Sequence, residues 1–178
     1  MVLPNISYDV SYRNIKYPRL EFKTGKLLFI LPIGYEPNFF LEKHRKWIAQ
    51  KSEFIRKCLK ASSGRKLVKR TDKQFRNLVY SFVNKTSEEI DVELNRVFYK
   101  RMKTKWASLS PKRNLTVNTL LRHLPNKLIE YVIFHEIAHI IEKKHNNKFW
   151  KIIIKKFKNY QRLEQDLFIY WFQVAKKL

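Results

Sequence analysis

The stretch YVIFHEIAHIIEKKHNNKFWKIIIKKF, residues 131–157, decides the fold because it places a polar motif on an apolar helix. Glu136 directly follows the first of three histidines that fall within eleven residues: His135, His139 and His145. Residues four apart lie on one face of a helix, so the first two imidazoles can point at a single site. The pattern predicts a helix that Pro125 opens at its first position and that runs through these histidines.

A zinc-binding site is the first interpretation of this motif. A catalytic zinc ion takes three protein ligands and keeps one open position, and His145 lies far enough beyond His139 for the chain to turn back and supply the third. Glu136 is about 100° around the helix axis from His135, where a carboxylate can act beside a metal without binding it. The alternative is a core helix with satisfied histidines. We favour the metal site, because several buried imidazoles without a ligand would leave donors and acceptors unpaired.

The charge of the chain predicts a negatively charged partner. The 178 residues contain 38 Lys and Arg against 15 Asp and Glu, a net charge of +23. Such an excess of positive charge raises the rate at which the protein encounters any polyanion. DNA or RNA would bind through a basic surface on the first helix and the connection that follows it, around residues 43–70. The alternative, which stays open, is a solvated lysine-rich exterior.

The chain shows no targeting or membrane signal. Its first twenty residues lack a cationic start followed by a long apolar run, and its apolar runs are far shorter than the roughly 20 residues that a spanning helix needs. Cys58 is the single cysteine, so neither an intrachain disulfide nor a thiolate zinc cluster can form. We expect a cytoplasmic protein that is not bound to a membrane and that is a monomer.

The N-terminal part of the chain is predicted to form a subdomain of a β-hairpin and a helix, residues 1–70. Residues 8–33 are β-prone, with Thr24-Gly25 as the hairpin turn. Apolar residues then recur at helical spacing from Pro37 to about Leu59, with lysines and arginines between them. A small, polar and cationic stretch over residues 62–73 indicates a flexible connection.

Residues 71–178 are predicted to form the catalytic domain. Helical spacing returns from Gln74 to about Tyr99, with a new helix start at Thr86–Glu89. A second hairpin over residues 101–118 turns at Ser110–Lys112, and two helices follow the histidines at about 147–158 and 162–176.

Two stretches resemble the YgjP-like zinc metallopeptidases in sequence, order and separation: KTKWASLSPKRNLTVN (103–118) and IEYVIFHEIAHIIEKKHNNKFW (129–150). The weaker match LLFILPIGYEPNFFLEKHRKWI (27–48) extends the resemblance over nearly the whole chain. The resemblance implies an α+β fold, a compact zincin core with a small antiparallel sheet and an active-site helix. It also implies three zinc ligands, His135, His139 and His145, with Glu136 as the catalytic acid/base. The WLM and SprT-type proteases have a similar histidine helix followed by aromatic residues.

Departures from known patterns narrow the subclass. The family hairpin Trp-Gly-Ser-Cys-Ser is Trp-Ala-Ser-Leu-Ser here, at residues 106–110, which leaves the metal chemistry unaffected. Glu142 replaces the metzincin glycine and no methionine follows the site, so that subclass is excluded. Glu142 or Glu164 replacing His145 as a ligand is an open alternative.

The expected function is zinc-dependent hydrolysis of a peptide bond in a protein or peptide substrate, with a zinc-activated water and Glu136 as general base and acid. The strand through Trp106–Ser110 would hold the substrate as an added strand. The rival interpretation is a basic nucleic-acid-binding protein whose zinc only holds the fold. Glu136 distinguishes the two, because a structural site needs no base beside an open coordination position.

Overall fold

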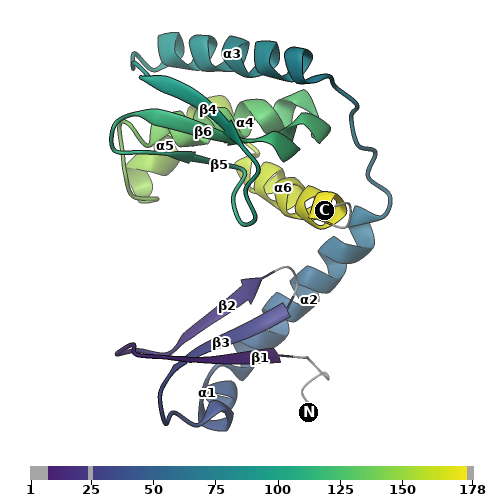
Figure 1. Ribbon diagram of the computed structural model, residues 1–178, viewed down its shortest axis with the longest axis vertical. Helices are drawn as coiled ribbons and strands as arrows, with labels where there is room; N and C mark the ends of the chain where they lie inside the picture. The colour runs from purple at the N-terminus through teal and green to yellow at the C-terminus, as the bar shows by residue number, and fades with distance from the viewer. Residues whose placement is uncertain (1–7, 24–25, 176–178) are drawn as a thin grey trace. The chain divides into compact units, whose positions relative to one another are not determined.

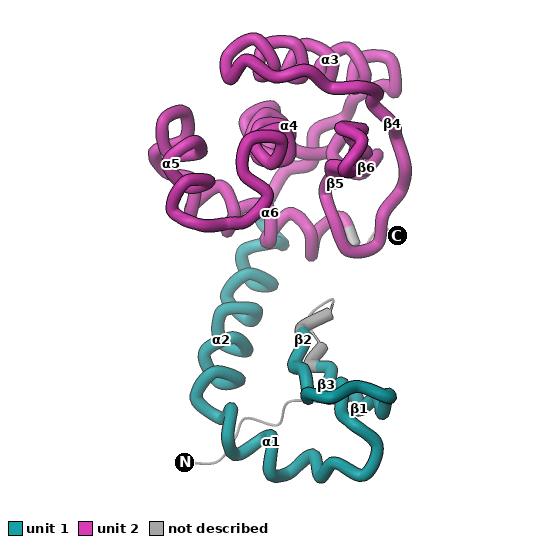
Figure 2. Tube along the Cα trace, turned by 90° about the vertical axis from the view of Figure 1, so that its left-hand side faces the viewer, with its two compact units in different colours: residues 1–64, 175–178 teal, residues 65–174 magenta. Residues whose placement is uncertain are grey.

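The structure is a computed structural model that describes residues 8–23 and 26–175. The chain forms two compact units, residues 1–64 with 175–178 and residues 65–174 (Figure 2). The expected domain boundary after residue 70 stays a prediction.

The first unit pairs a small sheet with two helices (Figure 1). Its strands are β1 (Tyr8–Arg13), β2 (Arg19–Lys23) and β3 (Lys26–Pro32), in the order β1-β3-β2. β2 and β3 are antiparallel, as the predicted hairpin requires, and its turn at Thr24-Gly25 lies outside the described residues. The single expected helix is instead two, α1 (Pro37–Lys43) and α2 (Arg45–Ser62), separated at His44. Their core is formed by Phe29, Leu31, Phe40 and Ile48.

The second unit contains the histidine motif. It consists of α3 (Asp72–Glu89), β4 (Arg96–Lys100), β5 (Ala107–Leu109), β6 (Asn114–Asn118), the 3₁₀ turn η1 (Thr119–His123), α4 (Asn126–Ala138), α5 (Asn147–Lys156) and α6 (Tyr160–Ala175). The described strands form a sheet in the order β4-β6-β5, which places β5 at an edge. α3 packs against α4, and α4 contacts both β5 and α5. The α+β class is therefore confirmed.

Two predicted features of this unit are wrong in detail. The sheet is mixed rather than antiparallel, because β4 runs parallel to β6 while β5 is antiparallel to it. Thr86–Glu89 ends α3 instead of starting a helix, and β4 replaces the helix expected to reach Tyr99. In β4, side chains alternate between exposed and half-buried, and this period of two belongs to a strand.

Helix α4 is the centre of the core of the second unit. Eight of its thirteen residues are buried, including Ile129, Ile133 and Ile137. Pro125 caps the helix instead of occupying its first position. The second hairpin and the two last helices lie where they were expected. None of the helices among the described residues is long and apolar enough to cross a membrane.

Candidate metal centre

The three histidines lie on one continuous piece of chain. His135 is in the last turn of α4, His139 directly follows that helix, and His145 lies in the turn before α5. The turn is compact, since the N–H groups of Ile141 and Glu142 both donate to the Ala138 carbonyl. The Asn146 side chain then caps α5 by accepting from the N–H groups of Lys148 and Phe149. The chain thus folds back within a few residues of His139.

The folded-back chain brings the three imidazoles together. One ring nitrogen from each of His135, His139 and His145 lies within 4.8 Å of the others, the single such group among residues 8–23 and 26–175. The Nε2 atoms of His135 and His145 are 3.0 Å apart. His135 and His139 are half-buried and His145 is exposed. The arrangement leaves one side of the group open to solvent.

A backbone carbonyl fixes the tautomer of His139. Its Nδ1 lies 3.0 Å from the Glu142 carbonyl oxygen, and a carbonyl oxygen can only accept, so Nδ1 carries the proton. The Nε2 atom of His139 therefore keeps its lone pair, as in histidines that ligate metals through one nitrogen and donate from the other.

Aromatic rings hold the imidazoles in place. The Phe149 ring lies 4.9, 4.5 and 4.7 Å from the rings of His135, His139 and His145, and it is fully buried. Trp150 stacks on His145 at 5.7 Å. Phe149 is buried and Trp150 half-buried, so both rings pack against the histidines rather than lie free in solvent.

Burial favours the neutral form of two of the imidazoles, those of His135 and His145. Burial, with added repulsion from His139 and His145, lowers the pKa of His135 to about 3. Burial also lowers the pKa of His145, although Glu164 acts in the opposite sense. Neutral imidazoles offer the lone pairs that zinc and other borderline metals bind. The donor set fits such an ion.

Glu136 points from α4 to the edge strand. Its Oε2 accepts a hydrogen bond of 3.0 Å from the Leu109 N–H in β5. Burial raises the pKa of the Glu136 carboxyl, while His139, the Leu109 N–H and Lys105 lower it. One carboxylate oxygen is thus held by the sheet, and the other has no hydrogen-bond partner among the described residues.

The two alternative carboxylate ligands have other partners. Glu164 accepts a 3.0 Å hydrogen bond from the buried Tyr131 hydroxyl, and burial raises the pKa of that phenol. The Glu142 carboxylate accepts from the Lys144 N–H at 3.1 Å. Neither carboxylate belongs to the group of close metal-binding atoms, which consists of nitrogens from the three histidines.

Sequence reasoning missed the contacts that orient these residues. Tyr131 lies one helical turn before His135, with its ring 5.8 Å from the imidazole, and this spacing could have identified it. The amide of Leu109 could not be found, because a backbone donor 27 residues from Glu136 leaves no side-chain signal.

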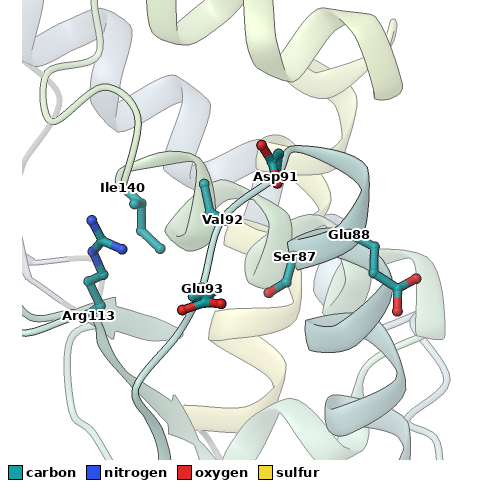
Figure 3. A pocket seen from close by; sticks show the side chains of 7 residues that line it. All are labelled: Ser87, Glu88, Asp91, Val92, Glu93, Arg113 and Ile140. Atoms are coloured by element: carbon teal, nitrogen blue, oxygen red, sulfur yellow. The ribbon is translucent and has the colours of Figure 1, made fainter.

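A separate hollow of about 530 Å³ lies beside the turn that follows α4 (Figure 3). Its lining includes three acidic residues, Arg113 of the β5–β6 turn and Ile140, which directly follows His139. The three histidines do not line it, so it is distinct from the metal centre.

The chain is similar to known metallopeptidases. The family model described as YgjP-like, metallopeptidase domain, matches residues 57–169. A curated relative, UTP pyrophosphatase of Escherichia coli (strain K12), is 30% identical over 67 residues, which are 38% of this chain and 40% of that relative. The match thus spans less than half of the relative's length.

Two solved metallopeptidase zymogens are also similar. Abylysin of Pyrococcus abyssi is 19% identical with a TM-score of 0.47, and the match covers 50% of this chain and 90% of that chain. Jannalysin of Methanocaldococcus jannaschii is 27% identical with a TM-score of 0.46, and the match covers 56% and 97%.

Proposed function

The chain belongs to the YgjP-like metallopeptidase domain family, and from this premise we propose that it is a zinc-dependent peptidase. His135, His139 and His145 hold the metal, and Glu136 is the general base and acid. The observation that carries the proposal is the position of Glu136: a carboxylate held by a backbone amide, on the helix that supplies two of the imidazoles. A structural metal site would need no such group.

Glu136 moves the proton in this proposal. Its Oε2 stays bonded to the Leu109 N–H, so Oε1 is the atom that takes a proton from the attacking water and passes it to the leaving amine. Zinc, when bound, supplies a Lewis acid. The packing around Phe149 keeps the imidazoles in place while the proton moves.

Strand β5 holds the substrate. Trp106 and Ser110 bond to β6 through their backbone groups, and bonding directions alternate along an antiparallel strand, so the backbone groups of Ala107 and Leu109 face away from β6. The Leu109 N–H is taken by Glu136. The Ala107 N–H and C=O and the Leu109 C=O therefore remain to pair with an extended peptide, which would add a strand beside Glu136.

The test is digestion of a peptide library by zinc-loaded protein. Glu136→Gln should retain zinc, measured by mass spectrometry of the native protein, and should hydrolyse peptides at least about 100-fold more slowly. Glu130→Gln is the matched control, since Glu130 lies on the same helix but pairs with Lys156; it should keep its activity. Equal turnover by the Glu136→Gln protein would exclude Glu136 from the chemistry, and loss of zinc from it would make Glu136 structural.

Phosphoanhydride hydrolysis is the second candidate. The curated relative is named UTP pyrophosphatase, and a metal centre with a general base can activate water toward phosphorus as well as toward carbon. Incubation of the zinc- or magnesium-loaded protein with UTP, with release of pyrophosphate measured, tests it. Release that depends on Glu136 and exceeds peptide cleavage would favour this candidate.

Nucleic acid is proposed as a partner rather than a substrate. The support is the net charge of +23, which would give binding with a steep salt dependence and weak sequence preference. Titration of single- and double-stranded oligonucleotides at several salt concentrations tests it, and absence of binding near 50 mM salt would refute it.

A further inference from the structure

The connection between β4 and β5 is cationic and exposed. Residues 94–129 contain nine Lys and Arg and no Asp or Glu. Four of the nine lie within six residues, here called the 100–105 loop: Lys100, Arg101, Lys103 and Lys105. All four are exposed. Elsewhere in this unit several cations pair with carboxylates, for example Lys156 with Glu130, but none of these four forms an ion pair within the described residues.

The backbone of the 100–105 loop is anchored. Asn118 is fully buried, and its side-chain amide donates to the carbonyl oxygens of Met102, at 2.9 Å, and Lys105, at 2.7 Å. Its own N–H donates to the Trp106 carbonyl at 2.8 Å, and the Trp106 ring meets Trp171 edge to face at 4.8 Å. The four cations are therefore presented from a fixed backbone.

The 100–105 loop leads directly into the strand that contacts Glu136. Lys105 is four residues before Leu109, a distance of about 13 Å along an extended chain. A lysine side chain reaches back over part of that distance. A peptide added along β5 would pass Lys105 four residues, and Lys103 six residues, from the position opposite Leu109.

We propose that the 100–105 loop recognises acidic side chains of the substrate, about four to six residues from the position opposite Leu109. This inference rests on the proposed peptidase function. Four cations without counter-charges repel one another, and an acidic side chain among them lowers that repulsion and gains a Coulomb attraction that a neutral or basic side chain lacks.

Binding and cleavage of matched peptides test the inference separately. Three labelled peptides of equal length would carry Asp, Ala or Lys at the flanking positions. Fluorescence anisotropy measures their binding to the zinc-loaded Glu136→Gln protein. Their cleavage is measured with the wild-type protein. The Asp peptide should bind about 2- to 5-fold more tightly than the Ala peptide at low salt, and salt should reduce this advantage. In the Glu136→Gln background, Lys103→Gln/Lys105→Gln should remove most of the binding advantage and leave the affinity for the Ala peptide unchanged.

The matched control is Lys73→Gln/Lys158→Gln, which removes two exposed cations from other elements of the same unit. It should keep the preference for the Asp peptide. An Asp preference that survives in the loop variant, or that falls equally in the control, would overturn the inference. So would loop-dependent binding of UTP without any Asp preference, since the loop would then serve a triphosphate. An Asp preference in binding with no cleavage of any peptide would support the loop's role and refute the peptidase function.

Discussion

Replacement of Phe149 by leucine should weaken metal binding more than it weakens the fold. The ring is fully buried and lies within 4.9 Å, centre to centre, of all three imidazoles. It stacks on His139 with an angle of 20° between the planes. Leucine retains most of the apolar contact with the core but leaves the imidazoles without a flat surface to hold their orientation.

The magnitude follows from two separate effects. A buried Phe→Leu change removes part of a well-packed side chain and should lower the free energy of unfolding by about 1–2 kcal/mol. Loss of the contacts that orient the ligands should lower the zinc affinity by about 10- to 100-fold, the usual effect of disturbing groups that position metal ligands. Phe75→Leu is the matched control, because Phe75 is equally buried but packs on Tyr99.

Urea denaturation of the metal-free proteins measures the first effect, and competition with a chromophoric zinc chelator measures the second. Both variants should lose similar stability, and Phe149→Leu alone should lose zinc affinity. Equal zinc affinities in the two variants would show that Phe149 is ordinary core packing and that the imidazoles hold their own orientation.

Three further substitutions have expected outcomes. Asn118→Ala leaves the Met102 and Lys105 carbonyls without their donor and should lower the free energy of urea unfolding by about 2–4 kcal/mol; a change below about 0.5 kcal/mol would show that water replaces the amide. Asn146→Ala removes the cap of α5 and should cost about 1 kcal/mol in thermal unfolding, whereas an unchanged melting temperature would mean that the turn needs no cap. Burial raises the pKa of Tyr99 to about 12, so the folded chain keeps a proton that the unfolded chain loses near pH 10, and stability falls as the pH rises between these values. Tyr99→Phe should reduce this loss of unfolding free energy by about 1–2 kcal/mol. Equal losses in the wild type and the variant would contradict the explanation.

The cluster of three histidines could be predicted from the sequence because its members are local. His135 and His139 are related by helical spacing alone, and His145 needed only a short turn. The β5–β6 hairpin was predictable for the same reason, since its turn at Ser110–Lys112 has its own chemistry.

The remaining features depend on contacts between distant segments. β4 pairs in parallel with β6 although β5 lies between them in the sequence. Parallel strands are not joined by a tight turn, so the sequence between them has no turn motif that would reveal the pairing. The helical interpretation through Tyr99 failed because short apolar runs fit a helix and a strand equally well. The break at His44 between α1 and α2 likewise has no glycine or proline to mark it.

The hydrogen bond between Leu109 and Glu136 has a consequence for the order in which the site forms during folding. The ligands and the rings that hold them come from residues 135–150, so closing this segment costs little chain entropy, whereas the bond to Glu136 joins residues 27 apart in the sequence. Local contacts form before long-range strand pairing in most small proteins. Under the proposed function, a nascent chain whose strand β5 has not yet docked would bind zinc before Glu136 was positioned, and it would not yet cleave neighbouring polypeptides.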